Sequence, residues 1–91
     1  MIYVSDEKPA FDPTGPAYVY MQLADHIAAR IDRGELRPAA RLPGERDLAE
    51  EYGVALGTAR RAVRELRDRK LVITLPAKGT YIRATKDDDA R

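Results

Sequence analysis

Apolar residues recur every three or four positions along the first long stretch of the chain, residues 18–33. This spacing is that of one face of an α-helix. The stripe consists of Tyr20, Leu23, Ala24, Ile27, Ala28 and Ile31. It predicts an amphipathic helix that packs on a core and ends at Gly34. The polar residues predicted to face water are Gln22, Asp25, His26, Arg30 and Arg33.

Two shorter helices with a tight turn between them are predicted within residues 42–66. One face of the first consists of Leu48, Ala49 and Tyr52, and one face of the second consists of Ala59, Val63 and Leu66. Gly44 precedes the first helix as an acceptable but weak N-cap. Gly53 follows it, where the chain needs a left-handed residue. Two helices joined by a short glycine turn are typical of a helix-turn-helix.

A β-hairpin is predicted after these helices. Residues 71–75 (LVITL) are apolar and β-branched, residues 76–79 form a turn, and residues 80–84 return as a second strand. Residues 35–43, between the first and second helices, are predicted to be a loop held by Leu36 and Leu42. The fold class is therefore mainly α with a small β-hairpin, built from three helices plus the hairpin.

The third predicted helix carries a basic face opposite its apolar one, formed by Arg60, Arg61 and Arg64. The whole chain has 16 basic and 15 acidic residues, and this balance alone does not indicate a nucleic-acid partner. Charge is nevertheless distributed unevenly, because basic residues outnumber acidic ones between Arg60 and Lys70. Arg64, Arg67, Arg69 and Lys70 extend this basic character, although Arg67 and Lys70 are better explained by the helix C-terminus, where cations are favoured. A local basic face is what contact with phosphates requires.

These segments together resemble the DNA-binding domain of the GntR family of bacterial transcription regulators. The matching segments, all in register, are LPGER, DLAEEYGV, TARRAVREL, KLV and KGTYI. The resemblance covers residues 18–82 and implies a winged helix-turn-helix that binds double-stranded operator DNA sequence-specifically. It places the recognition helix, at about residues 56–69, in the major groove. The hairpin becomes the wing, whose tip at residues 76–79 reaches the minor groove.

The resemblance and the chemistry of the residues together predict the DNA contacts. Arg46 lies in the first turn of its helix, where a cation opposes the helix dipole, so a contact with phosphate or the groove edge explains it better than helix stability. The residues expected to meet the duplex are Arg46, Gly57, Thr58, Arg60, Arg61, Arg64, Lys78, Gly79 and Thr80.

The chain departs from the family at the start of the recognition helix. Ala55, Leu56 and Gly57 stand where a serine cap, an arginine and a threonine are usual. One hypothesis is that the helix starts late, with Gly57 as its cap. A second is that readout is altered, with Leu56 available for apolar contact such as a thymine methyl group. Ala39 also replaces a usual loop glycine, which predicts a small change in loop shape.

The wing tip departs from the family as well, because Lys78 is its only charged residue. The sequence therefore predicts a stiffer and weaker wing. These departures leave an alternative function open, a protein-interaction module on a winged-helix scaffold with weakened or lost DNA readout. The surviving basic face of the third helix argues against that alternative.

The composition does not favour an enzyme. The only serine is Ser5, there is no cysteine, and His26 is the only histidine. No phosphate loop or dinucleotide fingerprint is present, so no cofactor is expected. No metal site is expected either, because three adjacent carboxylates at residues 87–89 without a scaffold are usually solvated. Without a long apolar run or a signal peptide, the prediction is a cytoplasmic protein that does not enter membranes.

The predicted domain organisation is an extended N-terminal arm at residues 1–16, the winged helix-turn-helix at 17–84 and a charged tail at 85–91. Because the chain ends just past the wing, no small-molecule effector is expected to bind within it. A homodimer is a further hypothesis, since family operators are palindromic. It would be held by the arm through Ile2, Tyr3 and Phe11, or would form only on DNA.

Overall fold

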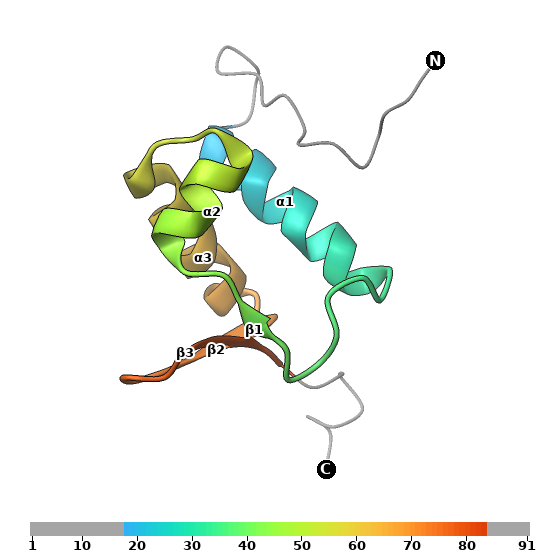
Figure 1. Cartoon of the computed structure of the whole chain (residues 1–91). Helices are drawn as coiled ribbons and strands as arrows, with labels where there is room; N and C mark the ends of the chain where they lie inside the picture. The colour runs from blue at the N-terminus through green and yellow to red at the C-terminus, as the bar shows by residue number, and fades with distance from the viewer. Residues whose placement is uncertain (1–17, 84–91) are drawn as a thin grey trace.

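Three helices and three short strands make up residues 18–83, the part of the chain that the computed structural model describes (Figure 1). In chain order they are α1 (Val19–Asp32), β1 (Arg41–Leu42), α2 (Glu45–Tyr52), α3 (Leu56–Asp68), β2 (Val72–Leu75) and β3 (Gly79–Ile82). The predicted fold class, a winged helix-turn-helix of three helices plus a wing, is confirmed. The predicted arm and tail, and the domain ends at residues 17 and 84, lie outside the described residues.

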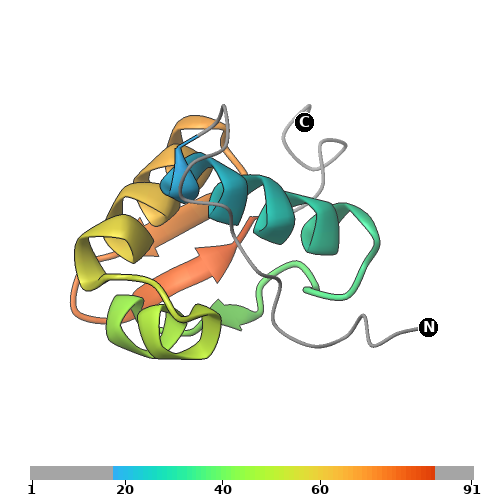
Figure 2. The ribbon, with the colours of Figure 1, turned by 90° about the horizontal axis from the view of Figure 1, so that it is seen from above.

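The core lies between the helices and the sheet, which occupies one side of the helical layer (Figures 1 and 2). The buried residues are Leu23, Ala24, Ile27, Leu42, Leu48, Ala49, Tyr52, Ala59, Ala62, Val63, Leu66, Val72 and Ile82. They include members of all three predicted apolar stripes, so these stripes are confirmed as core faces. Burial of this apolar surface is the main force that holds such short helices in place, since they would be marginal alone.

The turn between α2 and α3 depends on Gly53. Its φ of 67° lies in the left-handed region, and its N–H caps the carbonyl of Ala49. The chain then becomes extended at Ala55, whose carbonyl accepts a hydrogen bond from the N–H of Ala59 at 3.0 Å. This bond closes the first turn, so α3 begins at Leu56. The hypothesis of a late start with Gly57 as the cap is therefore wrong, because a backbone bond and the buried Ala59 fix the first turn without a side-chain cap.

The sheet has three strands in the order β1-β3-β2. The predicted hairpin is confirmed as an antiparallel pair in which Val72 lies opposite Ile82 and Leu75 opposite Gly79. The prediction that residues 35–43 are entirely a loop is wrong, because Arg41 and Leu42 form β1 and pair with β3. A two-residue strand has too short a pattern to be recognised, and its existence depends on a partner late in the chain.

The loop before β1 holds a non-glycine residue in a conformation that favours glycine. Ala39 has a φ of 71°, in the left-handed region. Its N–H donates a 2.8 Å hydrogen bond to the carbonyl of Ile82, and the N–H of Ile82 donates an equally short one to the carbonyl of Ala40. These two bonds continue the pairing of β1 with β3 and stabilise the loop against the local cost of the left-handed residue.

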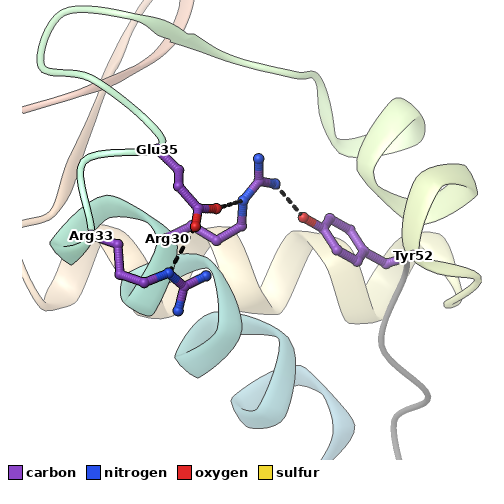
Figure 3. Close-up of polar contacts among 4 residues, drawn as sticks. All are labelled: Arg30, Arg33, Glu35 and Tyr52. Atoms are coloured by element: carbon purple, nitrogen blue, oxygen red, sulfur yellow. Dashed lines mark hydrogen bonds and ion pairs between the residues drawn. The ribbon is translucent and has the colours of Figure 1, made fainter. Parts of the chain in front are cut away.

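A polar cluster joins the end of α1 to the end of α2 (Figure 3). The guanidinium of Arg30 donates a 2.9 Å hydrogen bond to the hydroxyl of Tyr52 and another to Glu35. Arg33 also donates to Glu35, and the hydrogen bonds from Arg33 and Arg30 lower the pKa of that carboxyl. His26 packs edge-on against the Tyr52 ring. The prediction that His26 and Arg30 simply face water is thus wrong, since both are partly buried against α2.

Candidate nucleic-acid interface

The basic face of α3 consists of Arg60, Arg61 and Arg64, all exposed. It exists because the opposite face of the same helix is buried as part of the core through Ala59, Ala62, Val63 and Leu66. The start of α3 and the wing tip lie on the same side of the molecule, away from the turn that follows α1 (Figures 1 and 2). We call Arg60, Arg61 and Arg64 the arginine face.

Arg60 connects the arginine face to the start of α2. Its Nε donates a hydrogen bond to an oxygen of the Glu45 carboxylate at 3.2 Å, and its side chain is 54% exposed. An exposed ion pair of this kind contributes little to stability. Arg60 can therefore exchange this partner for a phosphate or a base edge at small cost. Until then, Glu45 restricts the orientation of the guanidinium.

Arg61 is held from the other side, by α1. Its guanidinium carbon lies 4.2 Å from the centre of the Tyr20 ring, a cation–π contact. Tyr18 stacks against Tyr20 in turn, with ring centroids 6.1 Å apart. Tyr18 is 77% exposed. The stack places aromatic surface from α1 beside the arginine face, a feature that the sequence reasoning missed.

Arg46 and Arg64 are exposed, and the side chain of neither forms a hydrogen bond or ion pair with another residue in the described range 18–83. Arg46 follows Glu45 at the start of α2. The carboxylate of Glu45 is the one that pairs with Arg60. Arg46 therefore lies in the same turn of α2 as the residue that pairs with the arginine face. The unengaged guanidinium groups of Arg46 and Arg64 belong to a basic surface suited to an anionic backbone.

The wing contributes Lys78, Gly79 and Thr80 in different ways. Lys78 is exposed at the tip, while Gly79 begins β3 with a φ of 129° that L side chains rarely adopt. The hydroxyl of Thr80 lies 2.9 Å from that of Thr74. Thr74 in turn accepts a hydrogen bond from Arg67. Thr80 thus already takes part in a bond that supports the wing.

Arg41 is a basic residue near the wing that the sequence reasoning missed. Its guanidinium covers Gly79, because a Cβ placed there would lie only 2.7 Å from Nε of Arg41. A cleft of about 180 Å³ separates the wing from the start of α2. Its lining residues are Arg41, Leu42, Pro43, Gly44, Glu45, Val63, Gly79 and Thr80. No pattern in the sequence identifies Arg41, because its position follows only from the unpredicted pairing of β1 with β3.

The first turn of α3 has a different character from the arginine face. Leu56 is 37% exposed, and Gly57 is exposed with no atom within 4 Å of where its Cβ would be. Thr58 is half-buried. The predicted site residues Gly57 and Thr58 thus belong to a small, nearly uncharged surface at the helix start, next to the arginines of the following turn.

Arg69 was predicted to extend the basic character of α3, and this is wrong. Its guanidinium pairs with Glu65 at 2.9 Å and with Asp25 of α1 at 2.8 Å. Hydrogen bonds to Glu65 and Asp25 raise the pKa of Arg69. The two carboxylates neutralise its charge and fasten α3 to α1. Arg69 therefore serves the fold.

Other kinds of site find little support in residues 18–83. That range contains no group of three or more His, Asp or Glu residues placed to hold a metal ion. Burial, with the nearby charges of Arg30 and Arg33, lowers the pKa of His26. His26 is accordingly neutral at pH 7 and packed against Tyr52. None of the described helices is both long enough and apolar enough to cross a membrane.

The fold and the basic surface define a winged helix-turn-helix of the DNA-binding kind, and solved structures support this class. A GntR family transcriptional regulator from Listeria monocytogenes matches with a TM-score of 0.76 and 28% identity, over 85% of this chain and 66% of that one. AraR(DBD) in complex with operator ORX1 matches with a TM-score of 0.66 and 27% identity, over 76% of this chain and 89% of that one.

Sequence comparison then gives the family. Residues 19–82 match the family described as bacterial regulatory proteins, gntR family, and the chain belongs to it. The HTH-type transcriptional regulator SmoD of Agrobacterium fabrum is 37% identical over 73 residues, which cover 80% of this chain and 31% of SmoD. The chain thus spans about a third of the length of such curated relatives.

Proposed function

We propose that this protein binds a double-stranded operator and regulates transcription from it, in the bacterial cytoplasm. Helix α3 enters the major groove with the arginine face, and the wing tip reaches the adjacent minor groove. Arg46 meets the backbone at the groove edge. In this proposal, Gly57 and Thr58 lie against base edges, while Lys78, Gly79 and Thr80 form the minor-groove contact with Arg41 beside them.

The observation that carries the proposal is the set of exposed arginines around the start of α2 and α3. Arg46 and Arg64 have no polar partner within residues 18–83, and Arg60 has only a weak exposed pair. Several exposed positive charges on one surface attract a partner of opposite charge. A duplex supplies a closely spaced row of such charges.

The protein-interaction alternative is not favoured. The relatives are transcription regulators, and a structural neighbour of similar fold was solved with operator DNA.

The proposal includes two copies of the chain on one operator. A single module of this size buries about 600–1,000 Å² of protein surface on DNA, which limits its affinity. A second copy of the chain, bound to the other half of a palindromic operator, would add the same set of DNA contacts again. Analytical ultracentrifugation with and without the duplex measures this directly. A strict one-to-one complex at all concentrations would reject this part of the proposal.

Fluorescence anisotropy of a labelled duplex at two salt concentrations tests the function. The side chains proposed to neutralise phosphates are Arg46, Arg60, Arg61, Arg64 and Lys78. Each phosphate contact contributes about −0.9 to the slope of log affinity against log salt, so five contacts give a slope of about −4.5. Between about 50 and 200 mM salt, affinity should fall about 500-fold. Absence of binding at the lower salt would reject the function.

The chain offers a matched pair of variants for this assay. Arg60 and Arg33 are both 54% exposed, and each pairs with one glutamate. Arg33 follows the last turn of α1, beside Glu35 (Figure 3), and the end of α1 lies on the opposite side of the molecule from the start of α3 (Figure 1). Arg60→Ala should weaken binding and make the salt slope shallower by about 1. Arg33→Ala removes the same charge and should leave both the affinity and the salt slope unchanged. If the two variants lose affinity equally, the effect is only one of net charge.

A further inference from the structure

An exposed leucine interrupts the basic surface of α3 at its N-terminal end. Leu56 is the first residue of α3, and its side chain is 37% exposed. Residues four apart follow one another along a helix face, so Leu56 is succeeded by Arg60 and then Arg64. The apolar side chain therefore continues the stripe that carries two of the arginines. The surface proposed to meet DNA begins with a hydrophobic group.

The position of Leu56 excludes a phosphate contact and favours a base contact. The side chain of Leu56 has no donor for a phosphate oxygen, whereas the first residues of a recognition helix are those whose side chains reach base edges. In the major groove of unmodified DNA, the apolar group that a base presents is the C5 methyl of thymine. A leucine pressed against any other base edge would cover polar atoms without bonding to them, at a cost in affinity.

The neighbours of Leu56 leave room for such a contact. Gly57 has no side chain, and nothing lies within 4 Å of its missing Cβ, so a base pair can approach the helix backbone closely there. Ala55, the residue before the helix, is small and makes no side-chain cap.

We infer that Leu56 is a specificity-determining residue that selects a thymine, by contact with its methyl group, at the base pair nearest the start of α3. The inference rests on the proposed function, since it requires α3 to lie in the major groove. It specifies one feature of the operator, a thymine at that base pair. An arginine in place of Leu56 would select guanine there. Recognition there is apolar and adds nothing to the salt slope.

Deoxyuridine provides the test, because it differs from thymidine only by the missing C5 methyl group of the base. An operator is first selected from a random duplex pool, and each thymine in it is then replaced singly by deoxyuridine. Affinity is measured by anisotropy at fixed salt. One position in each half-site should lose about fourfold in affinity, which is the value of one buried methyl group.

Protein variants assign that loss to Leu56. With Leu56→Ala, the thymine-to-deoxyuridine ratio at that position should fall to about one, while the salt slope stays unchanged. Leu75→Ala is the matched control, since Leu75 is an equally exposed leucine, at 39%, on the wing. It should keep the fourfold ratio. Leu56→Arg should shift the selected base toward guanine.

The outcomes separate this inference from the function on which it rests. Binding without any loss at any deoxyuridine, or a loss that Leu56→Ala retains, overturns the role of Leu56 and leaves DNA binding intact. Steep salt dependence with no selected sequence overturns it too. No duplex binding at low salt overturns the proposed function. The deoxyuridine series uses the unaltered protein, so it stands even if a variant folds poorly.

Discussion

Replacement of Ala39 by glycine should stabilise the protein, although Ala→Gly substitutions normally destabilise. Ala39 has a φ of 71°. A non-glycine residue in the left-handed region costs about 1–2 kcal/mol relative to its ordinary conformation. Glycine removes this cost but gives the unfolded chain more freedom, which is worth about 0.4–1 kcal/mol in the opposite direction. The difference lies between about 0 and 1.6 kcal/mol, and we take the middle of that range, a net gain of about 0.5–1 kcal/mol, because the backbone hydrogen bond from Ala39 to Ile82 is unaffected.

Thermal unfolding followed by circular dichroism measures this gain. In a domain of this size, each kcal/mol shifts Tm by about 4–8 °C, so Ala39→Gly should raise Tm by about 2–8 °C. Ala40→Gly is the matched control, because Ala40 is an exposed neighbour outside the left-handed region. It should lower Tm by a similar amount. If both variants lower Tm equally, the left-handed alanine is not strained and the reasoning is refuted.

Three further predictions follow from single contacts. Tyr52→Phe removes the acceptor for Arg30 and should cost about 1 kcal/mol in urea unfolding, whereas an unchanged midpoint would show that the 2.9 Å bond contributes nothing. The lowered pKa of His26 means that the unfolded chain binds a proton more readily. The stability contributed by the neutral imidazole should therefore be fully present well above pH 6.5, its ordinary pKa, and decline as pH falls through 6.5 toward the lower pKa of the folded state, and His26→Asn should flatten that decline. Gly79→Ala should lower Tm and displace Arg41, visible as a shift of its NMR side-chain signals, because the φ of 129° is unfavourable for alanine and a Cβ would lie 2.7 Å from Nε. Retention of both Tm and signals would contradict this.

The helices and the hairpin could be predicted because their signals are local. The stripe in α1 repeats over several turns, Gly53 supplies the left-handed residue that the turn needs, and β-branched residues mark β2. Each is a property of neighbouring residues, so the sequence alone expresses it. The arginine face was predictable for the same reason, since helical spacing places Arg60, Arg61 and Arg64 opposite the apolar face. Their individual roles on DNA remain predictions.

The features that sequence reasoning missed all depend on contacts between distant segments. Strand β1 exists only because β3 pairs with it, and the pairing of Arg69 with Asp25 joins α3 to α1. His26 is covered by a tyrosine of another helix. The predicted start of α3, at about residue 56, is confirmed, and only the alternative of a late start at Gly57 was wrong, because a backbone bond closes the first turn at Leu56. Tertiary contacts of this kind leave no periodic signal, so charge and polarity alone suggested exposure.

The pairing of β1 with β3 fixes the distance between the wing and the helix-turn-helix. Only Pro43 and Gly44 separate β1 from α2, so the wing is attached to the helix-turn-helix through its own sheet as well as through the chain after α3. The spacing between the proposed major-groove and minor-groove contacts is thus set by the fold before the protein meets DNA. An operator whose major and minor grooves are spaced differently from the two contacts must change its twist to bind. The protein should therefore discriminate between operators by their helical repeat, even at base pairs that it does not touch.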